Sequence, residues 1–138
     1  MKRRFPGLHK AAQPAEVPDG VYLVQVHRAQ YRWHAQKPFY ALQFGVLEPQ
    51  SFAGSLISGR IYCTEKALWK LSWFLRDFGY DADLLRQDEL DEKRMVGLAG
   101  VVKITTRHPN GTSLLNFDGF APAGRWRNRE VLAGRARR

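Results

Sequence analysis

Aromatic and basic side chains lie close together in several short stretches of this chain. The densest is YRWHAQK, residues 31–37. Aromatic rings can stack on nucleobases, and lysine or arginine can neutralise phosphates, so this combination suits a single-stranded nucleic acid. The candidate binding residues are Tyr31, Arg32, Trp33, Lys37, Phe39, Arg60, Tyr62, Lys103, Thr105, Arg107, Arg125, Trp126 and Arg127. Each base stacked on such a ring would contribute about 1–3 kcal/mol.

Each of these residues also has a purely structural interpretation. Aromatic side chains at the edge of a sheet often pack against their neighbours, and surface cations are often only solvated. A one-residue shift in strand register would turn Phe39 and Tyr62 inward. Trp33 has little local core to join, which favours a role in binding. Trp69 and Trp73 lie in an apolar helical stretch, and we expect them in the core.

Residues that could support catalysis or metal binding form no recognisable pattern. The four histidines lack the spacing of a zinc site. Cys63 has no base that the sequence places beside it. In the acidic stretch from Asp77 to Glu92, the residues Asp81, Asp83, Asp88, Glu89, Asp91 and Glu92 lack the glycine and the spacing of a calcium loop, so we interpret them as part of a solvated loop. We therefore expect no enzymatic activity, no cofactor and no metal.

Positive charge is concentrated towards the two ends of the chain. The formal net charge is +9, yet residues 20–123 contain 12 Lys/Arg against 10 Asp/Glu. Seven of those ten acids fall between Asp77 and Glu92, and six arginines follow Gly124. We therefore expect an acidic end of the domain and a basic strand surface that attracts polyanions.

The single cysteine and the hydropathy pattern indicate the cellular compartment. Cys63 cannot form an internal disulfide, which favours a reducing compartment. The basic start, MKRRFPGLHKAAQP, lacks the apolar segment of a signal peptide. No apolar run approaches the roughly 20 residues that span a bilayer. We expect a cytoplasmic protein without a membrane partner.

The hydrophobic pattern predicts one helix among five strands. Apolar residues recur at helical spacing over residues 64–79, with Thr64 as the N-cap and Gly79 as the C-terminal stop. Alternating patterns predict strands over residues 21–30, 38–48, 56–63, 98–108 and 112–120. Gly59 is expected to mark a bulge or bend. Residues 31–37 are expected to form a loop, and Pro109-Asn110-Gly111 a hairpin turn.

A helix between the third and fourth of five strands is the order of the OB-fold, a small Greek-key barrel with one helix at its end. We therefore predict a mainly β OB-fold domain over residues 19–122. A basic flexible arm, residues 1–18, precedes it, and a basic arginine-rich tail, residues 123–138, follows it.

Four segments resemble the single-stranded DNA-binding-like proteins of phages and mobile elements, a family with a domain of unknown function related to OB-fold SSB proteins. They are VPDGVYLVQV, KPFYALQFGVLE, GRIYCTEKALWKLSWFLRDFG and NFDGFAP, which span residues 17–122. The acidic stretch and the arginine tail depart from the family pattern. The acidic C-terminal tip, through which bacterial SSB proteins dock partners, is absent, so recruitment of repair proteins is not implied.

The residues and the resemblance together predict a protein that binds single-stranded DNA with little sequence preference. The resemblance implies a role in phage or mobile-element DNA replication or recombination, with proteins of those processes as partners and a homo-oligomer as an option. One alternative is a protein-interaction module in a nucleoprotein complex. Another is single-stranded RNA as the ligand, because no residue identifies a reader of the 2′-hydroxyl.

Overall fold

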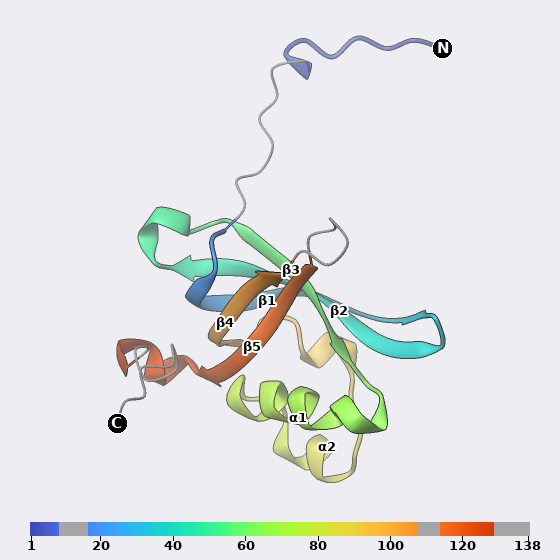
Figure 1. Cartoon of the computed structure of the whole chain (residues 1–138), viewed down its shortest axis with the longest axis vertical. Helices are drawn as coiled ribbons and strands as arrows, with labels where there is room; N and C mark the ends of the chain where they lie inside the picture. Colours follow the sequence, from blue (N-terminus) through green and yellow to red (C-terminus); the bar gives the residue numbers. More distant parts are fainter. Residues whose placement is uncertain (9–16, 108–113, 129–138) are drawn as a thin grey trace.

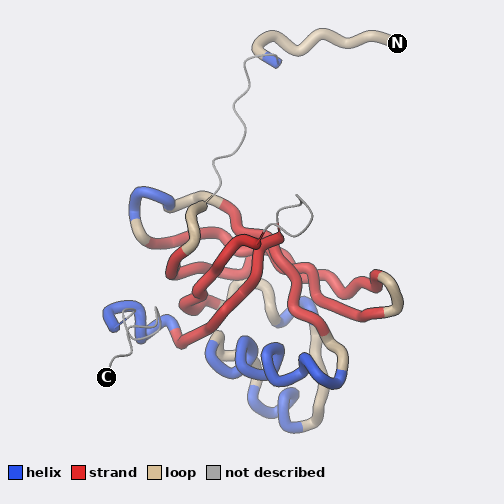
Figure 2. Tube along the Cα trace, viewed as in Figure 1, coloured by secondary structure: helices blue, strands red, loops and turns tan. Residues whose placement is uncertain are grey.

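The computed structural model describes residues 1–8, 17–107 and 114–128. The elements run in the order β1 (Gly20–His34), β2 (Lys37–Glu48), η2 (Gln50–Phe52), β3 (Leu56–Tyr62), η3 (Glu65–Ala67), α1 (Leu68–Asp77), α2 (Ala82–Arg86), η4 (Glu92–Arg94), β4 (Ala99–Arg107), β5 (Leu114–Pro122) and η6 (Ala123–Asn128) (Figure 1). The predicted mainly β chain with five strands and a helix between the third and fourth is confirmed. The helices α1 and α2 gather at one side of the sheet (Figure 2).

The five strands form one antiparallel sheet in the order β3-β2-β1-β4-β5. No hydrogen-bonded ladder joins the two edge strands, β3 and β5, within the described residues. The sheet is therefore not closed into a barrel, and the OB-fold prediction is not confirmed by strand pairing. The predicted turn at residues 109–111 and the tail from residue 129 lie outside the described residues.

The hairpin of β1 and β2 is longer than the sequence pattern indicated. The segment 31–37, expected to be a loop, continues the β1–β2 ladder as far as His34 and Lys37. Only Ala35 and Gln36 form the turn, with φ angles of 52° and 63°. The end of this hairpin projects beyond the sheet (Figure 1). It shows no apolar alternation because it has little core to cover.

The faces of the strands agree with the alternating pattern. The alternating pattern predicts that one face of each strand points inward, and the residues of that face are buried on β1 (Tyr22, Val24, Val26), β2 (Tyr40, Leu42, Phe44, Val46), β3 (Ile57, Ile61), β4 (Val102, Ile104) and β5 (Phe117). Cys63 and Leu115 are half-buried against the same core. These inward predictions are confirmed.

Five phenylalanines join the sheet to α1 and the turn that follows it. They are Phe44, Phe74, Phe78, Phe117 and Phe120, whose paired ring centroids lie 4.7–6.0 Å apart. We call them the phenylalanine cluster. Edge-to-face and tilted pairs of this kind contribute about 0.5–1.5 kcal/mol each beyond simple burial.

The helix differs from its prediction at its start. A 3-10 turn at Glu65–Ala67 precedes α1, and the Thr64 side chain makes no capping hydrogen bond. Gly79, with φ +82°, ends the helix as predicted. Trp73 packs against the core, but Trp69 is 61% exposed, so the prediction of a buried Trp69 is wrong.

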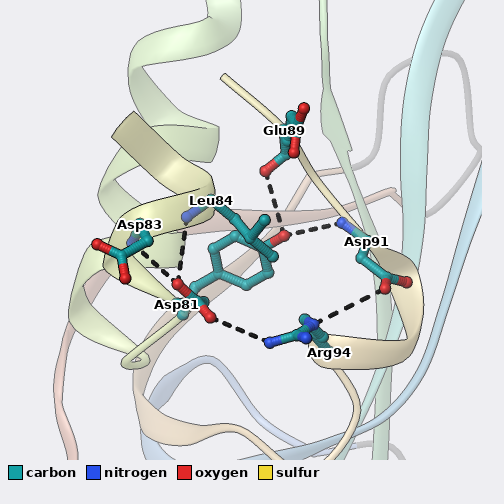
Figure 3. A network of polar contacts seen from close by, with 7 residues as sticks. Asp81, Asp83, Leu84, Glu89, Asp91 and Arg94 are labelled. Atoms are coloured by element: carbon teal, nitrogen blue, oxygen red, sulfur yellow. Dashed lines mark hydrogen bonds and ion pairs between the residues drawn. The ribbon is translucent and has the colours of Figure 1, made fainter. Parts of the chain in front are cut away.

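The acidic stretch is ordered by hydrogen bonds to its own backbone (Figure 3). Asp81 accepts from the amides of Asp83 and Leu84 at 2.8 and 3.2 Å and so caps α2. Asp91 caps η4 through the Lys93 amide at 3.0 Å. Arg94 bridges Asp81 and Asp91 at 3.0 and 3.9 Å. The carboxylates in this network stabilise local structure, which corrects the interpretation of a merely solvated loop.

Tyr80 holds the same stretch from inside. Its hydroxyl donates to the Glu89 carbonyl at 3.2 Å and accepts from the Asp91 amide at 2.8 Å. The Tyr80 side chain is buried in the core. The acidic stretch is therefore fastened to the core as well as capped internally.

Gly59 allows β3 and β5 to approach each other without pairing. A Cβ atom built on Gly59 would lie 2.6 Å from Cζ of Phe117 and 3.1 Å from Cδ2 of Leu115. The β2–β3 register is continuous there, so the expected bulge is absent. The glycine is needed for a close approach of a ring to backbone.

We predict that Gly59→Ala lowers the free energy of unfolding by about 1–3 kcal/mol, because the added methyl overpacks against Phe117. Urea denaturation would measure the loss. Gly124→Ala is the matched control, since no atom lies within 4 Å of its added Cβ. Phe117→Leu in the Gly59→Ala background should reduce the additional loss. Equal stabilities for Gly59→Ala and Gly124→Ala would contradict the close approach.

Candidate nucleic-acid interface

A groove of about 980 Å³ follows the unpaired edges of β3 and β5 and reaches the start of α1. We call it the seam groove. Its lining residues are His34, Ser58, Gly59, Arg60, Ile61, Tyr62, Lys66, Ala67, Trp69, Lys70, Arg107, Leu115 and Asn116. The β1–β2 hairpin, both edge strands, β4 and α1 therefore all contribute to one surface.

The seam groove is positively charged. Arg60, Lys66, Lys70 and Arg107 line it, and none of its described lining residues is acidic. A second hollow, of about 330 Å³, continues from it over the outward face of β1, β2 and β3 and adds Arg28. Clefts lined by one sign of charge raise the local concentration of oppositely charged ligands. The two hollows together form a basic path across β3.

Arg60 is held in place by aromatic neighbours. Its guanidinium lies 4.4 Å from the ring centroid of Phe39, and Nη1 donates to the Tyr62 hydroxyl at 3.3 Å. The rings of Phe39 and Tyr62 are 5.6 Å apart. Phe39 is on the predicted outward face but only 4% exposed, so its ring is covered in this structure and offers no free face to a base. Its neighbours cover it, and it positions Arg60 instead.

The residues predicted in the first loop lie on two faces of the β1–β2 hairpin. Tyr31 pairs with Tyr40 and Trp33 with Pro38, while Arg32 pairs with Phe39. Directly paired residues project to the same side of a sheet. Tyr31 and Trp33 therefore project towards the core side, and Arg32 towards the face of Arg60. The structure separates these residues instead of gathering them in one loop.

The aromatic side of the hairpin has its own contacts. The Tyr31 ring lies 5.4 Å from that of Tyr40 and 6.2 Å from that of Trp33. The Tyr31 amide donates to the Glu92 carboxylate at 3.0 Å. Trp33 is 61% exposed, as expected for a residue without a core to join. Lys37 is exposed beside the turn.

The three candidates on β4 do not all reach the groove. Arg107 is exposed and lines it. Lys103 and Thr105 are half-buried, and neither is among the described lining residues. Of the three predicted residues on β4, only Arg107 is among the described lining residues of the seam groove.

The candidates after β5 lie elsewhere. Arg125, Trp126 and Arg127 belong to η6, and the Trp126 indole N–H donates to the Glu48 carboxylate at 3.1 Å. Glu48 is the last residue of β2, at the end opposite the hairpin turn. Figure 1 shows η6 on the other side of the molecule from that turn. These residues are therefore separate from the seam groove.

Three groove residues on η3 and α1 escaped the sequence analysis. Trp69 stacks on Trp73 with centroids 6.1 Å apart and an interplanar angle of 25°. Lys70 places its Nζ 5.8 Å from the Trp69 ring, and Lys66 lies one turn earlier. On the helix predicted over residues 64–79, two lysines four residues apart would share one face. This spacing around Trp69 could have indicated an exposed flank.

Two ionisable groups near the hairpin are shifted by burial. Burial raises the pKa of Tyr40 to about 12, with smaller contributions from Cys63 and Glu92. Burial also raises the pKa of the Cys63 thiol. A raised thiol pKa leaves less of the nucleophilic thiolate at neutral pH. Within the described residues, no group of three or more His, Cys, Asp or Glu side chains is placed to hold a metal ion.

No protein-family model matches this chain, and no curated protein matches it. Among the described helices, none combines the length and the apolar character needed to cross a bilayer. The interpretation of the seam groove therefore rests on its own geometry and charge.

We predict that stability falls as the pH rises from 10 to about 12, because unfolded Tyr40, with a pKa of 10.0, loses its proton before folded Tyr40 does. The raised folded pKa contributes stability that is complete below pH 10. At about 1.4 kcal/mol for each pKa unit, the loss reaches about 3 kcal/mol. Urea denaturation across this range would measure it. Tyr40→Phe also changes stability at neutral pH, and this difference is subtracted first. The remaining fall in the free energy of unfolding between pH 10 and 12 should then be smaller than in the wild type. An equal fall in both proteins would contradict the burial of this hydroxyl.

Proposed function

We propose that this protein binds single-stranded DNA along the seam groove, with little sequence preference. The observation that carries the proposal is the groove lining. Four cations, from β3, β4, η3 and α1, converge there with the Tyr62 and Trp69 rings, and no described lining residue is acidic. Cations along a groove with interleaved aromatic rings suit a phosphate backbone whose bases are unpaired.

The strand order supports an OB-fold in which the contact between β3 and β5 is left unpaired. OB-folds bind single strands across strands two and three and the adjoining loops. The basic path over β1, β2 and β3 occupies the corresponding position in this chain. We extend the proposal to phage or mobile-element DNA replication or recombination on the strength of the resemblance in residues 17–122.

Binding would proceed by electrostatic capture followed by stacking. Neutralising phosphates releases condensed cations, so log affinity should fall with log salt by about 0.7 for each phosphate contact. Four groove cations give a slope of about −3. Any base can stack on the Tyr62 ring, because every base has a flat aromatic face. Binding by stacking is therefore expected to show little sequence preference.

A protein-interaction module is the second candidate. It is favoured by the exposed rings of Tyr31 and Trp33, which project from the hairpin on the side opposite Arg32. Exposed aromatic residues are enriched at protein interfaces. In this reading the groove cations would meet an acidic partner.

The test is fluorescence anisotropy of labelled oligo-dT titrated with the full chain at several salt concentrations. Arg60→Gln and Arg107→Gln should each weaken binding about tenfold or more, because a charge-assisted hydrogen bond contributes about 1.5–3 kcal/mol. The double variant should also lower the salt slope by about 1.4. Lys93→Gln, an exposed cation on η4 outside the described lining, is the matched control.

Arg60→Lys distinguishes lost charge from lost packing, because it keeps the charge over Phe39. Affinities equal to that of Lys93→Gln for both glutamine variants would remove the seam groove from the interface. The absence of saturable wild-type binding to oligo-dT would overturn the proposed function. Tighter binding of oligo-U than of oligo-dT would reassign the ligand to RNA.

A further inference from the structure

We propose that the start of α1 carries a nucleobase-stacking subsite, with Trp69 as its platform and Lys66 and Lys70 as phosphate contacts. This inference rests on the proposed function and extends it. A strand that crosses β3 would leave the sheet and continue onto the helix. The ligand of the subsite is one unpaired base together with its flanking phosphates.

The exposure of Trp69 is the first observation. Trp69 is 61% exposed, although it belongs to a helix that packs against the core. A large apolar side chain left in water forfeits the free energy of burial. It is placed in the wall of the seam groove, where a ligand can cover it. An aromatic ring in the wall of a cationic groove is the kind of platform on which unpaired bases stack.

The rigidity of the platform is the second observation. Trp69 stacks on Trp73, and the Trp73 indole N–H donates to the Asp77 carboxylate at 2.9 Å. Trp73 is also held by Phe120. Their rings meet edge to face, with centroids 5.7 Å apart and an interplanar angle of 89°. Phe120 is buried in the phenylalanine cluster. A platform held this way loses little conformational entropy when a base stacks on it.

The charges around the platform are the third observation. Lys66 precedes Trp69 by three residues and Lys70 follows it directly, and both line the groove. Lys70 already lies 5.8 Å from the indole centroid. Tyr62 lines the same groove from β3. Two aromatic rings with cations beside each suit a backbone that passes from one to the other.

This arrangement predicts a dependence on ligand length. A strand of about 16 nucleotides, the upper end of the site sizes of OB-folds, would extend from β3 to Trp69. A strand of about 4 nucleotides could occupy the β3 part alone. Trp69→Ala should therefore weaken the longer ligand by about 5- to 150-fold, the equivalent of one stacked base. The affinity for the shorter ligand should change little.

The experiment uses the full chain and the same labelled oligo-dT probes of both lengths. Trp69→Phe keeps a ring and should restore most of the affinity that Trp69→Ala loses. Leu68→Ala is the matched control, because Leu68 is an exposed apolar neighbour on α1 that is not among the described lining residues. The Lys66→Gln/Lys70→Gln double variant should lower the salt slope by about 1.4, whereas Lys93→Gln should lower it little.

The outcomes separate the two proposals. If the wild type binds and the Arg60 and Arg107 variants weaken it, but Trp69→Ala binds the longer strand as Leu68→Ala does, the subsite is wrong and the proposed function stands. If Trp69→Ala weakens both lengths equally, the length-dependent path onto the helix is wrong. If the wild type binds neither probe, both proposals fail.

Discussion

The packing of the phenylalanine cluster between the sheet and α1 is the interaction on which the rest of the structure depends. Phe44 and Phe117 belong to the sheet, while Phe74 and Phe78 come from α1 and the turn after it. Phe117 also packs against the β3 backbone at Gly59, so side-chain packing joins β3 and β5, between which the described residues form no hydrogen-bonded ladder. The groove exists because these strands are held near each other by side chains and leave backbone edges open. The orientation of α1, and with it the flank that carries Trp69, depends on the same rings.

The distribution of charge follows from where carboxylates are useful to the backbone. Asp81 and Asp91 cap α2 and η4, and Arg94 bridges them. The carboxylates of Asp81 and Asp91 are therefore bound within residues 81–94. No described lining residue of the seam groove is acidic. The basic surface therefore does not depend on the arginine tail. The groove surface is basic because acidic residues such as Asp81 and Asp91 lie at the starts of α2 and η4, where they accept hydrogen bonds from backbone amides.

The sequence predicted the parts of this fold that depend on local periodicity. Inward positions such as Tyr22 and Phe44 were predicted because alternation alone decides them. The apolar stripe alone does not show which flank of the helix meets the sheet, and the exposure of Trp69 could be inferred only from the lysines at positions 66 and 70. Burial of Phe39 depends on Arg60, which comes from another strand. Barrel closure likewise depends on a distant pair of strands, and no local pattern reports it.

The turn at the tip of the hairpin has a bearing on engineering. Ala35 and Gln36 both occupy left-handed backbone conformations, with φ of 52° and 63°. Side chains disfavour this geometry by about 1–2 kcal/mol for each residue, and Asn-Gly is the pair that such turns prefer. The tip is therefore held by the ladder behind it, against the preference of its own residues. Replacing Ala35 and Gln36 with residues that favour this backbone geometry should raise the free energy of unfolding. Neither residue is among the described lining residues of the seam groove.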